Sequence, residues 1–203
     1  MHNRHFADTG SNQDEASTST QRRASKATSQ DDSYHSARNR LFIILSYYVG
    51  LRACEIASLK VGDVVDGEGN IKDTVFLTKD MTKGSKANSV YLSEFVKKEI
   101  KKYLESNTER LVTLKSPLIY SQRTGGHFSS QTLHILFKTL YSNVGINASS
   151  HSGRRKFITD LSEKGVSVRV IQELARHRDL ATTQRYIDVS VDKLRNAVNL
   201  VGI

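Results

Sequence analysis

From Ala37 onward, apolar residues recur mostly at the spacing of an α-helix. Leu41, Ile44, Leu45 and Tyr48 share one helix face, and Gly50 follows as a stop signal. Strand-like runs are confined to residues 63–66, 71–78 and 89–92, which are separated by the turn-prone sequences GEGN and KGSK. The sequence therefore predicts a mostly α fold with a small antiparallel β-sheet, of the α+β class.

Capping residues and apolar spacing predict the remaining helices. Ser93 is placed to cap a helix that runs to about Glu105, and Ser129 or Ser130 to cap another. The last third of the chain is expected to form short helices at about 151–164, 167–175, 180–187 and 190–200.

The first 36 residues differ from the rest because they contain almost no large apolar side chains. Such a segment cannot bury enough surface to offset the entropy of ordering it, so we expect residues 1–36 to form a disordered polar tail. The remainder, residues 37–203, is long enough for one domain with its own core.

The chain is basic, with a formal net charge of +9. Residues 37–203 hold 26 Lys and Arg against 16 Asp and Glu, or +10, so the positive charge belongs to the predicted folded part. A basic surface favours a polyanionic partner, either nucleic acid or an anionic membrane surface.

The sequence argues against a membrane-spanning protein, a secreted disulfide-bonded protein and a zinc protein. The apolar run that begins at Leu41 is far shorter than the roughly 18 residues of a membrane span, and the N-terminus has no apolar leader. The single cysteine, Cys54, allows no internal disulfide and fits a reducing compartment. Cys and His residues do not cluster at zinc-site spacing, so we expect no metal.

Four segments hold polar side chains that a helical core does not need. They are GLRACEIASL with Arg52 and Glu55, TKGSKANSVYL with Lys83 and Lys86, HSGRR with His151 and Arg154, and ELARHRDLATTQRYI with His177 and, nine residues later, Tyr186.

Taken in this order, the segments resemble the tyrosine recombinase family, of the phage-integrase kind. That family has an Arg in a G-L-R-x-x-E turn, a Lys in a β-hairpin, an H-x-x-R pair, and a His followed nine residues later by a nucleophilic Tyr in a T-T-x-x-Y context. The resemblance covers about residues 37–200 and implies that residues 37–203 form the family's catalytic domain.

The resemblance implies a role for each residue in metal-free phosphodiester cleavage. Such a reaction needs a nucleophile, an acid for the leaving group and cations for the transition state. By resemblance, Tyr186 is the nucleophile and His151 accepts its proton, while Lys83 protonates the departing 5′-hydroxyl. Arg52 and Arg154, helped by His177, hold the non-bridging phosphate oxygens. No cofactor is implied.

Several charged residues and histidines are open to more than one interpretation. Lys86 is a rival to Lys83, but alignment of the family's G-K-G-x-K on TKGSK favours Lys83. Glu55 is interpreted as a structural residue that orients the site, and His127 and His134 as surface residues. A DNA-backbone face, with salt-sensitive and sequence-independent contacts, is predicted at Lys86, Arg155, Arg176, Arg178 and Arg185.

The sequence also departs from the family pattern. Arg176 stands where a Gly commonly precedes the second His, and the family's H-x-L-R-H is HSGRR here, with Gly153 and Arg155 at its third and fifth places. Typical members carry a separate core-binding domain upstream, whereas here a polar tail precedes the predicted domain. Either the protein is a compact single-domain recombinase, which the initial Met favours, or a domain is missing from the chain.

The end of the chain carries an apolar stripe at Val191, Leu194, Val198 and Val201. It can pack on its own domain or, as the resemblance implies, dock on a neighbouring protomer. The implied partners are double-stranded DNA, a homo-oligomer on DNA (a tetramer formed through the helix at 190–200) and an accessory DNA-bending protein, with no membrane.

The function predicted from these features is site-specific DNA recombination through a 3′-phosphotyrosyl intermediate, in integration, excision or inversion. The alternatives are a type IB topoisomerase-like relaxing enzyme and a non-catalytic DNA-binding regulator of the same fold. A membrane-surface protein fits least, because no strongly basic amphipathic helix is present. We expect a cytoplasmic protein that is nucleoid-associated when bound to DNA.

Overall fold

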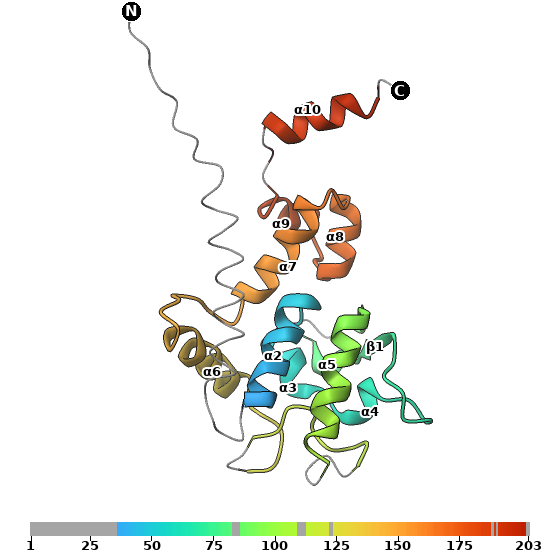
Figure 1. Ribbon diagram of the computed structural model, residues 1–203, viewed down its shortest axis with the longest axis vertical. Helices are drawn as coiled ribbons and strands as arrows, with labels where there is room; N and C mark the ends of the chain where they lie inside the picture. Colours follow the sequence, from blue (N-terminus) through green and yellow to red (C-terminus); the bar gives the residue numbers. More distant parts are fainter. Residues whose placement is uncertain are drawn as a thin grey trace, which may run out of the picture.

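The computed structural model of the chain describes residues 36–82, 86–108, 113–121, 124–187, 189 and 191–201. In this part of the chain the fold is mostly helical with a two-stranded antiparallel sheet, as the sequence predicts (Figure 1). The predicted disordered tail lies outside the described residues, apart from Ser36, which begins the first helix.

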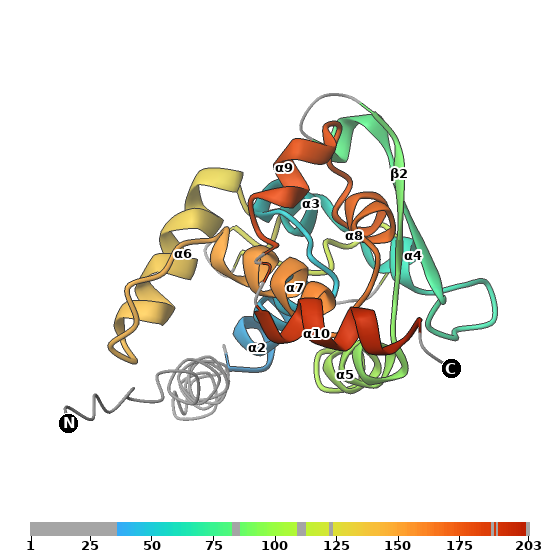
Figure 2. The same cartoon turned by 90° about the horizontal axis from the view of Figure 1, so that it is seen from above.

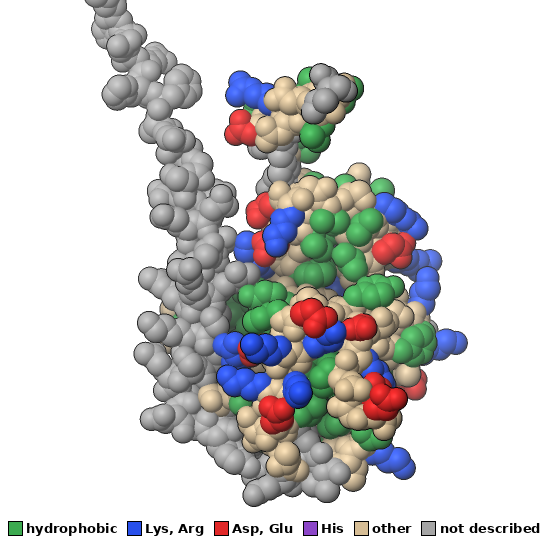
Figure 3. All heavy atoms as spheres, turned by 45° about the vertical axis from the view of Figure 1, so that its right-hand side comes forward, with side chains coloured by type: hydrophobic (Ala, Val, Ile, Leu, Met, Phe, Trp, Pro, Cys, Tyr) green, Lys and Arg blue, Asp and Glu red, His purple; other side chains and the backbone are tan. Residues whose placement is uncertain are grey.

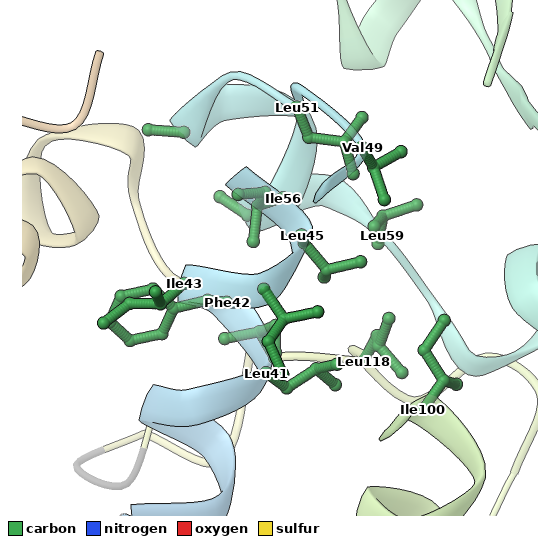
Figure 4. Packing of buried hydrophobic residues seen from close by; sticks show 14 of the residues in the cluster. Leu41, Phe42, Ile43, Leu45, Val49, Leu51, Ile56, Leu59, Ile100 and Leu118 are labelled. Carbon is green, nitrogen blue, oxygen red and sulfur yellow. The ribbon is translucent and has the colours of Figure 1, made fainter. Parts of the chain in front are cut away.

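Helix α2 (Ser36–Tyr48) runs through the centre of the larger core. Its side chains from Leu41 to Tyr47 are buried all round, so it is a central helix rather than an amphipathic surface helix (Figure 4). The ring of Phe42 meets that of Phe137 edge-on, with 4.8 Å between their centroids. Each fully buried side chain of this size contributes about 1.5–3 kcal/mol to folding.

Gly50 ends α2 in a left-handed conformation, with φ of +67°. A Cβ atom at this position would lie 2.6 Å from the ring of Phe157. Glycine is therefore required here for both backbone geometry and space. The turn at Gly50 leads into α3 (Ala53–Ser58).

The sheet consists of β1 (Thr74–Leu77) and β2 (Asn88–Tyr91), paired with Val75 opposite Val90. These two valines face the core, while Phe76 and Tyr91 are exposed on the other face. The 3-10 turn η1 (Lys79–Met81) follows β1.

The predicted strand at 63–66 is wrong. Residues Val61–Val64 form a short helix, α4, and only Val65 makes an isolated bridge, to Ile71. Val61 and Val64 are both buried, which is helical spacing. The Asp63 carboxylate accepts the backbone N–H of Lys60 at 2.7 Å, a local hydrogen bond that favours a helix start over a strand.

The two predicted serine caps are confirmed. Ser93 Oγ accepts the backbone N–H of Val96 at the start of α5 (Glu94–Glu105). Ser129 Oγ accepts that of Thr132 at the start of α6 (Ser130–Ser142). Seen from above, α6 and the sheet lie on opposite sides of α2 (Figure 2).

The C-terminal helices are close to their predicted positions: α7 (Ser152–Glu163), α8 (Val168–Ala175), α9 (Leu180–Gln184) and α10 (Val191–Asn199). Helix α7 packs along α2 and leads into a second, smaller core centred on Ile158, Ile171 and Ala175. Gly153 makes the close approach possible, because a Cβ there would lie 2.8 Å from Tyr47 Cδ2. Among the described residues, no helix has the length and apolar character needed to cross a bilayer.

Candidate active site

The predicted catalytic side chains converge at the ends of short elements. Arg52 immediately precedes α3, Arg154 lies in the first turn of α7, His177 follows α8, and Tyr186 follows α9. The turn at Gly50 and the packing of α7 on α2 bring these segments together, although more than 130 positions separate the first from the last.

Glu55 lies at the centre of this cluster, and its side chain is fully buried. One carboxylate oxygen, Oε1, accepts from Arg52 Nη1 at 2.7 Å. The other, Oε2, accepts from the Arg52 backbone N–H at 2.8 Å and from Arg176 Nη2 at 2.7 Å. Burial alone would raise the pKa of Glu55, but Arg176 and Arg52 outweigh burial and hold it below its ordinary value. The carboxylate is therefore ionised, which fits its interpretation as a residue that orients the site.

Arg154 is almost completely buried, with 6% of its surface exposed. Its Nη1 donates to the carbonyl of Gly50, but its Nη2 has no hydrogen-bond partner within the described part of the chain. Burial, and then the charges of Arg52 and Arg176, lower the pKa of Arg154 to about 9. A buried, charged donor without a partner costs at least about 1–3 kcal/mol, so it points to an anion that completes the site.

His177 is neutral at pH 7. Burial, followed by the charges of Arg154, Arg52 and Arg176, lowers its pKa to about 4. Its Nδ1 lies 2.9 Å from the hydroxyl oxygen of Thr183, which is itself fully buried. Sequence reasoning missed Thr183 as a partner of this ring, although the signal was present in the TTQRY segment.

Tyr186 lies beside these groups, partly buried against the smaller core. Its ring centroid is 6.3 Å from that of His177. The guanidinium of Arg155 sits 5.9 Å from the Tyr186 ring, in cation–π geometry. Arg154 also interacts electrostatically with Tyr186. The structure thus gathers Arg52, Arg154, His177 and Tyr186 around one site.

The other two predicted catalytic residues are His151 and Lys83. His151 precedes α7 as its N-cap, at the exposed surface, three residues before Arg154, and its ring centroid lies 5.7 Å from that of His134. His134 is half-buried and bonds Ser150 Oγ through Nδ1. Lys83 lies outside the described residues, between β1 and β2.

Of the residues predicted to contact the DNA backbone, Arg155, Arg178, Arg185 and Lys86 are exposed. Arg176 differs from these four residues, because only 2% of its side chain is exposed and its charge is paired with Glu55. Arg176 itself has the αL backbone that ends α8, and its side chain lies inward, which the sequence alone did not indicate.

The arrangement is suited to binding a phosphate. Three guanidinium groups (Arg52, Arg154 and Arg176) surround one carboxylate, which leaves two net positive charges beside a phenol. Forked N–H donors match the oxygens of a tetrahedral anion. In the part of the chain that the structure describes, no group of three or more His, Cys, Asp or Glu residues could hold a metal ion.

Comparison with known proteins finds a matching family model and curated relatives that are named tyrosine recombinases. Residues 20–193 match the model of the phage integrase family. Tyrosine recombinase XerA of Pyrococcus horikoshii is 32% identical over 164 residues, covering 79% of this chain and 54% of that protein. Tyrosine recombinase XerD of Rickettsia bellii is 33% identical over 178 residues, covering 84% and 58%. The chain thus spans little more than half the length of these curated relatives.

Solved structures agree on the fold. A crystal structure of XerA recombinase superposes with a TM-score of 0.68 at 25% identity, covering 91% of this chain and 64% of that one. The Tn1549 transposon integrase in complex with transposon right end DNA gives 0.70 at 14% identity, covering 91% and 65%. This likeness confirms the fold class predicted from the sequence.

Proposed function

Because the chain belongs to the phage integrase family, we propose that it is a site-specific DNA recombinase that cuts and rejoins strands through a 3′-phosphotyrosyl link at Tyr186. The observation that carries the proposal is the unpartnered Nη2 of the buried Arg154, set among positive charges next to Tyr186. A scissile phosphate is the anion that would supply the missing acceptor. The names of the relatives, all tyrosine recombinases, support the same reaction.

In the proposed reaction, the Tyr186 oxygen attacks the scissile phosphorus and the bond to the 5′ oxygen breaks. The phenolic proton passes to His151, and Lys83 gives a proton to the departing 5′-hydroxyl. One phosphodiester is exchanged for another, so the bond is conserved and a 5′-hydroxyl of a partner strand can reverse the step. No metal or nucleotide enters this balance.

Arg52 and Arg154 are proposed to hold the non-bridging oxygens as negative charge develops on them. Their positions are set before substrate arrives, by Glu55 and by the carbonyl of Gly50. Preorganised donors of this kind typically each contribute on the order of 10² to 10³ in rate.

His177 is proposed to act as a neutral hydrogen-bond donor to the same phosphate. Its low pKa means that it enters the reaction as a neutral imidazole, which carries one N–H to donate. Thr183 engages Nδ1 and leaves Nε2 for the substrate. A bound phosphate anion would offset the positive charges of the three arginines and so raise the pKa of His177.

Contacts to the DNA backbone are proposed for the exposed Arg155, Arg178, Arg185 and Lys86. Arg155 is the best placed of these, because its guanidinium already lies over the Tyr186 ring. Such contacts would position the duplex and contribute salt-sensitive affinity without reading its sequence.

Helix α10 is proposed to join protomers. Its apolar side chains are exposed, Val191 by 63%, Leu194 by 56% and Val198 by 72%, and it stands away from the body (Figures 1 and 3). These exposures support docking on a neighbouring protomer over packing on its own domain. We propose a tetramer on DNA, assembled through this helix with an accessory DNA-bending protein. Removal of residues 190–203 should abolish assembly and preserve the fold, and unchanged assembly would contradict the proposal.

Covalent trapping tests the proposed function. The protein and its Tyr186→Phe variant are incubated, without metal, with nicked duplexes drawn from the DNA that flanks its gene. A protein–DNA adduct that survives denaturant is expected with the wild type alone. An adduct that also forms with Tyr186→Phe would contradict the assignment of the nucleophile. Recombination between two sites, rather than relaxation of supercoils alone, separates the proposal from the topoisomerase-like alternative.

A further inference from the structure

Arg176 has an unusual backbone conformation. Among the described residues it is the one non-glycine with a positive φ, at 53° with ψ of 44°, and it ends α8. L-residues with a long side chain rarely adopt this left-handed region, and the family pattern has a glycine here. A strained backbone at a site residue persists only when surrounding contacts compensate for it, so it prompts a search for what those contacts do.

The Arg176 side chain is buried and makes contacts with several parts of the site. Its Nη2 donates to Glu55 Oε2 at 2.7 Å and to the carbonyl of Gly50 at 3.0 Å. Its Nη1 donates to the carbonyl of Leu174 at 3.0 Å. Its own backbone carbonyl accepts from Arg52 Nη2 at 3.3 Å. Arg176 therefore contacts Arg52 directly, the carboxylate that holds Arg52, and the carbonyl to which Arg154 donates.

We propose that Arg176 is a positioning residue that fixes the Arg52 guanidinium for phosphate binding. Arginine and a carboxylate favour a fork in which two N–H groups meet both oxygens. Arg176 occupies Oε2 of Glu55, so the Arg52 side chain is confined to Oε1 and to the Arg176 carbonyl. Without the Arg176 side chain, Arg52 can fold onto both oxygens of Glu55 and turn its donors away from the phosphate.

The inference rests on the proposed function in taking Arg52 as a phosphate contact. Its test is therefore anion binding, which needs no DNA cleavage. Arg176→Gly is an informative variant because glycine relaxes the αL backbone, so a loss of binding cannot be assigned to added backbone strain. Arg169→Ala is the matched control, since it removes the same charge from the same helix at a side chain that is 74% exposed and is paired with Glu173 instead of Glu55.

The experiment is calorimetric titration of the full chain with inorganic tungstate, a tetrahedral oxyanion, at low salt. Arg176→Gly should bind tungstate at least about tenfold more weakly than the wild type. Arg169→Ala removes a charge that solvent screens, so it should change tungstate binding less than about twofold. Equal binding by Arg176→Gly and the wild type would overturn the inference. So would equal losses in the two variants, because net charge alone would then explain the effect.

Arg176→Lys keeps the test decisive if the glycine variant does not fold. Lysine retains the charge but, as a compact ammonium, cannot bridge Glu55 and the two carbonyls together. It should bind tungstate about three- to tenfold more weakly than the wild type, and binding equal to the wild type would overturn the inference. If the wild type itself does not bind tungstate, the phosphate site fails and the inference fails with it.

Discussion

Replacement of the buried carboxylate at Glu55 by an amide is the perturbation whose cost the structure defines best. Glu55→Gln preserves shape but leaves one acceptor oxygen where the carboxylate had two. Those two oxygens receive three donors at 2.7–2.8 Å, from Arg52 and Arg176. The amide nitrogen must then face an N–H group, so at least one guanidinium loses its partner.

The two arginines differ in what that loss costs. The Arg52 side chain is 24% exposed and can be rehydrated, which limits its cost to about 0–1 kcal/mol. The Arg176 side chain is 2% exposed and cannot. An uncompensated buried charge costs about 3–5 kcal/mol, and the remaining amide oxygen recovers part of it, so we expect Glu55→Gln to lower the free energy of unfolding by about 3 kcal/mol.

Urea unfolding at pH 7 measures this free energy. Glu173→Gln is the control, because it removes a carboxylate that is also paired with an arginine, Arg169, but at 68% exposure. The control should change stability by no more than about 0.5 kcal/mol. Because the pKa of Glu55 is lowered on folding, its stabilisation is present above its ordinary value of 4.5 and is lost as pH falls below it. A loss below about 1 kcal/mol at pH 7, or one equal to the control, would refute the reasoning.

Three further predictions follow from the same geometry. Gly153→Ala places a Cβ 2.8 Å from Tyr47 Cδ2 and should destabilise the fold by about 1–3 kcal/mol in urea unfolding, whereas Gly67→Ala, with nothing within 4 Å, should change it little. Since the pKa of His177 falls from 6.5 to about 4 on folding, stability should decline as pH drops from 6.5 towards 4, and less so in His177→Asn. Arg185→Ala should weaken DNA binding similarly for all sequences and reduce the slope of log affinity against log salt by about 1, and a loss confined to one sequence would contradict a backbone contact.

The sequence predicted those features that depend on local chemistry. Ser93 and Ser129 could be recognised as caps because a serine before an amphipathic segment acts through its immediate neighbours. The strand predicted at 63–66 is wrong because a helix start, marked by the hydrogen bond from the Lys60 N–H to the Asp63 carboxylate, competed with a short β-like pattern. Residue type alone did not reveal this competition.

The sequence predicted four residues that the structure brings together, Arg52, Arg154, His177 and Tyr186, but it did not predict their contacts. The spacing from His177 to Tyr186 and the GLRACE segment indicated which residues belong together. Nothing in the sequence indicated that the Arg176 side chain lies inward, because its contact with Glu55 joins residues that are 121 positions apart. Thr183 was missed for a related reason, as its role depends on burial beside His177 rather than on its position in a motif.

The central claim is that Tyr186 attacks a phosphate held by Arg52 and Arg154. Peptide mapping of the trapped adduct by mass spectrometry tests it most directly, after nuclease and protease digestion. The account predicts that the remaining nucleotide is attached through its 3′-phosphate to the peptide that contains Tyr186, and that the cleaved partner strand ends in a 5′-hydroxyl. A nucleotide attached to any other residue, or a 5′-phosphate at the cut, would contradict the account.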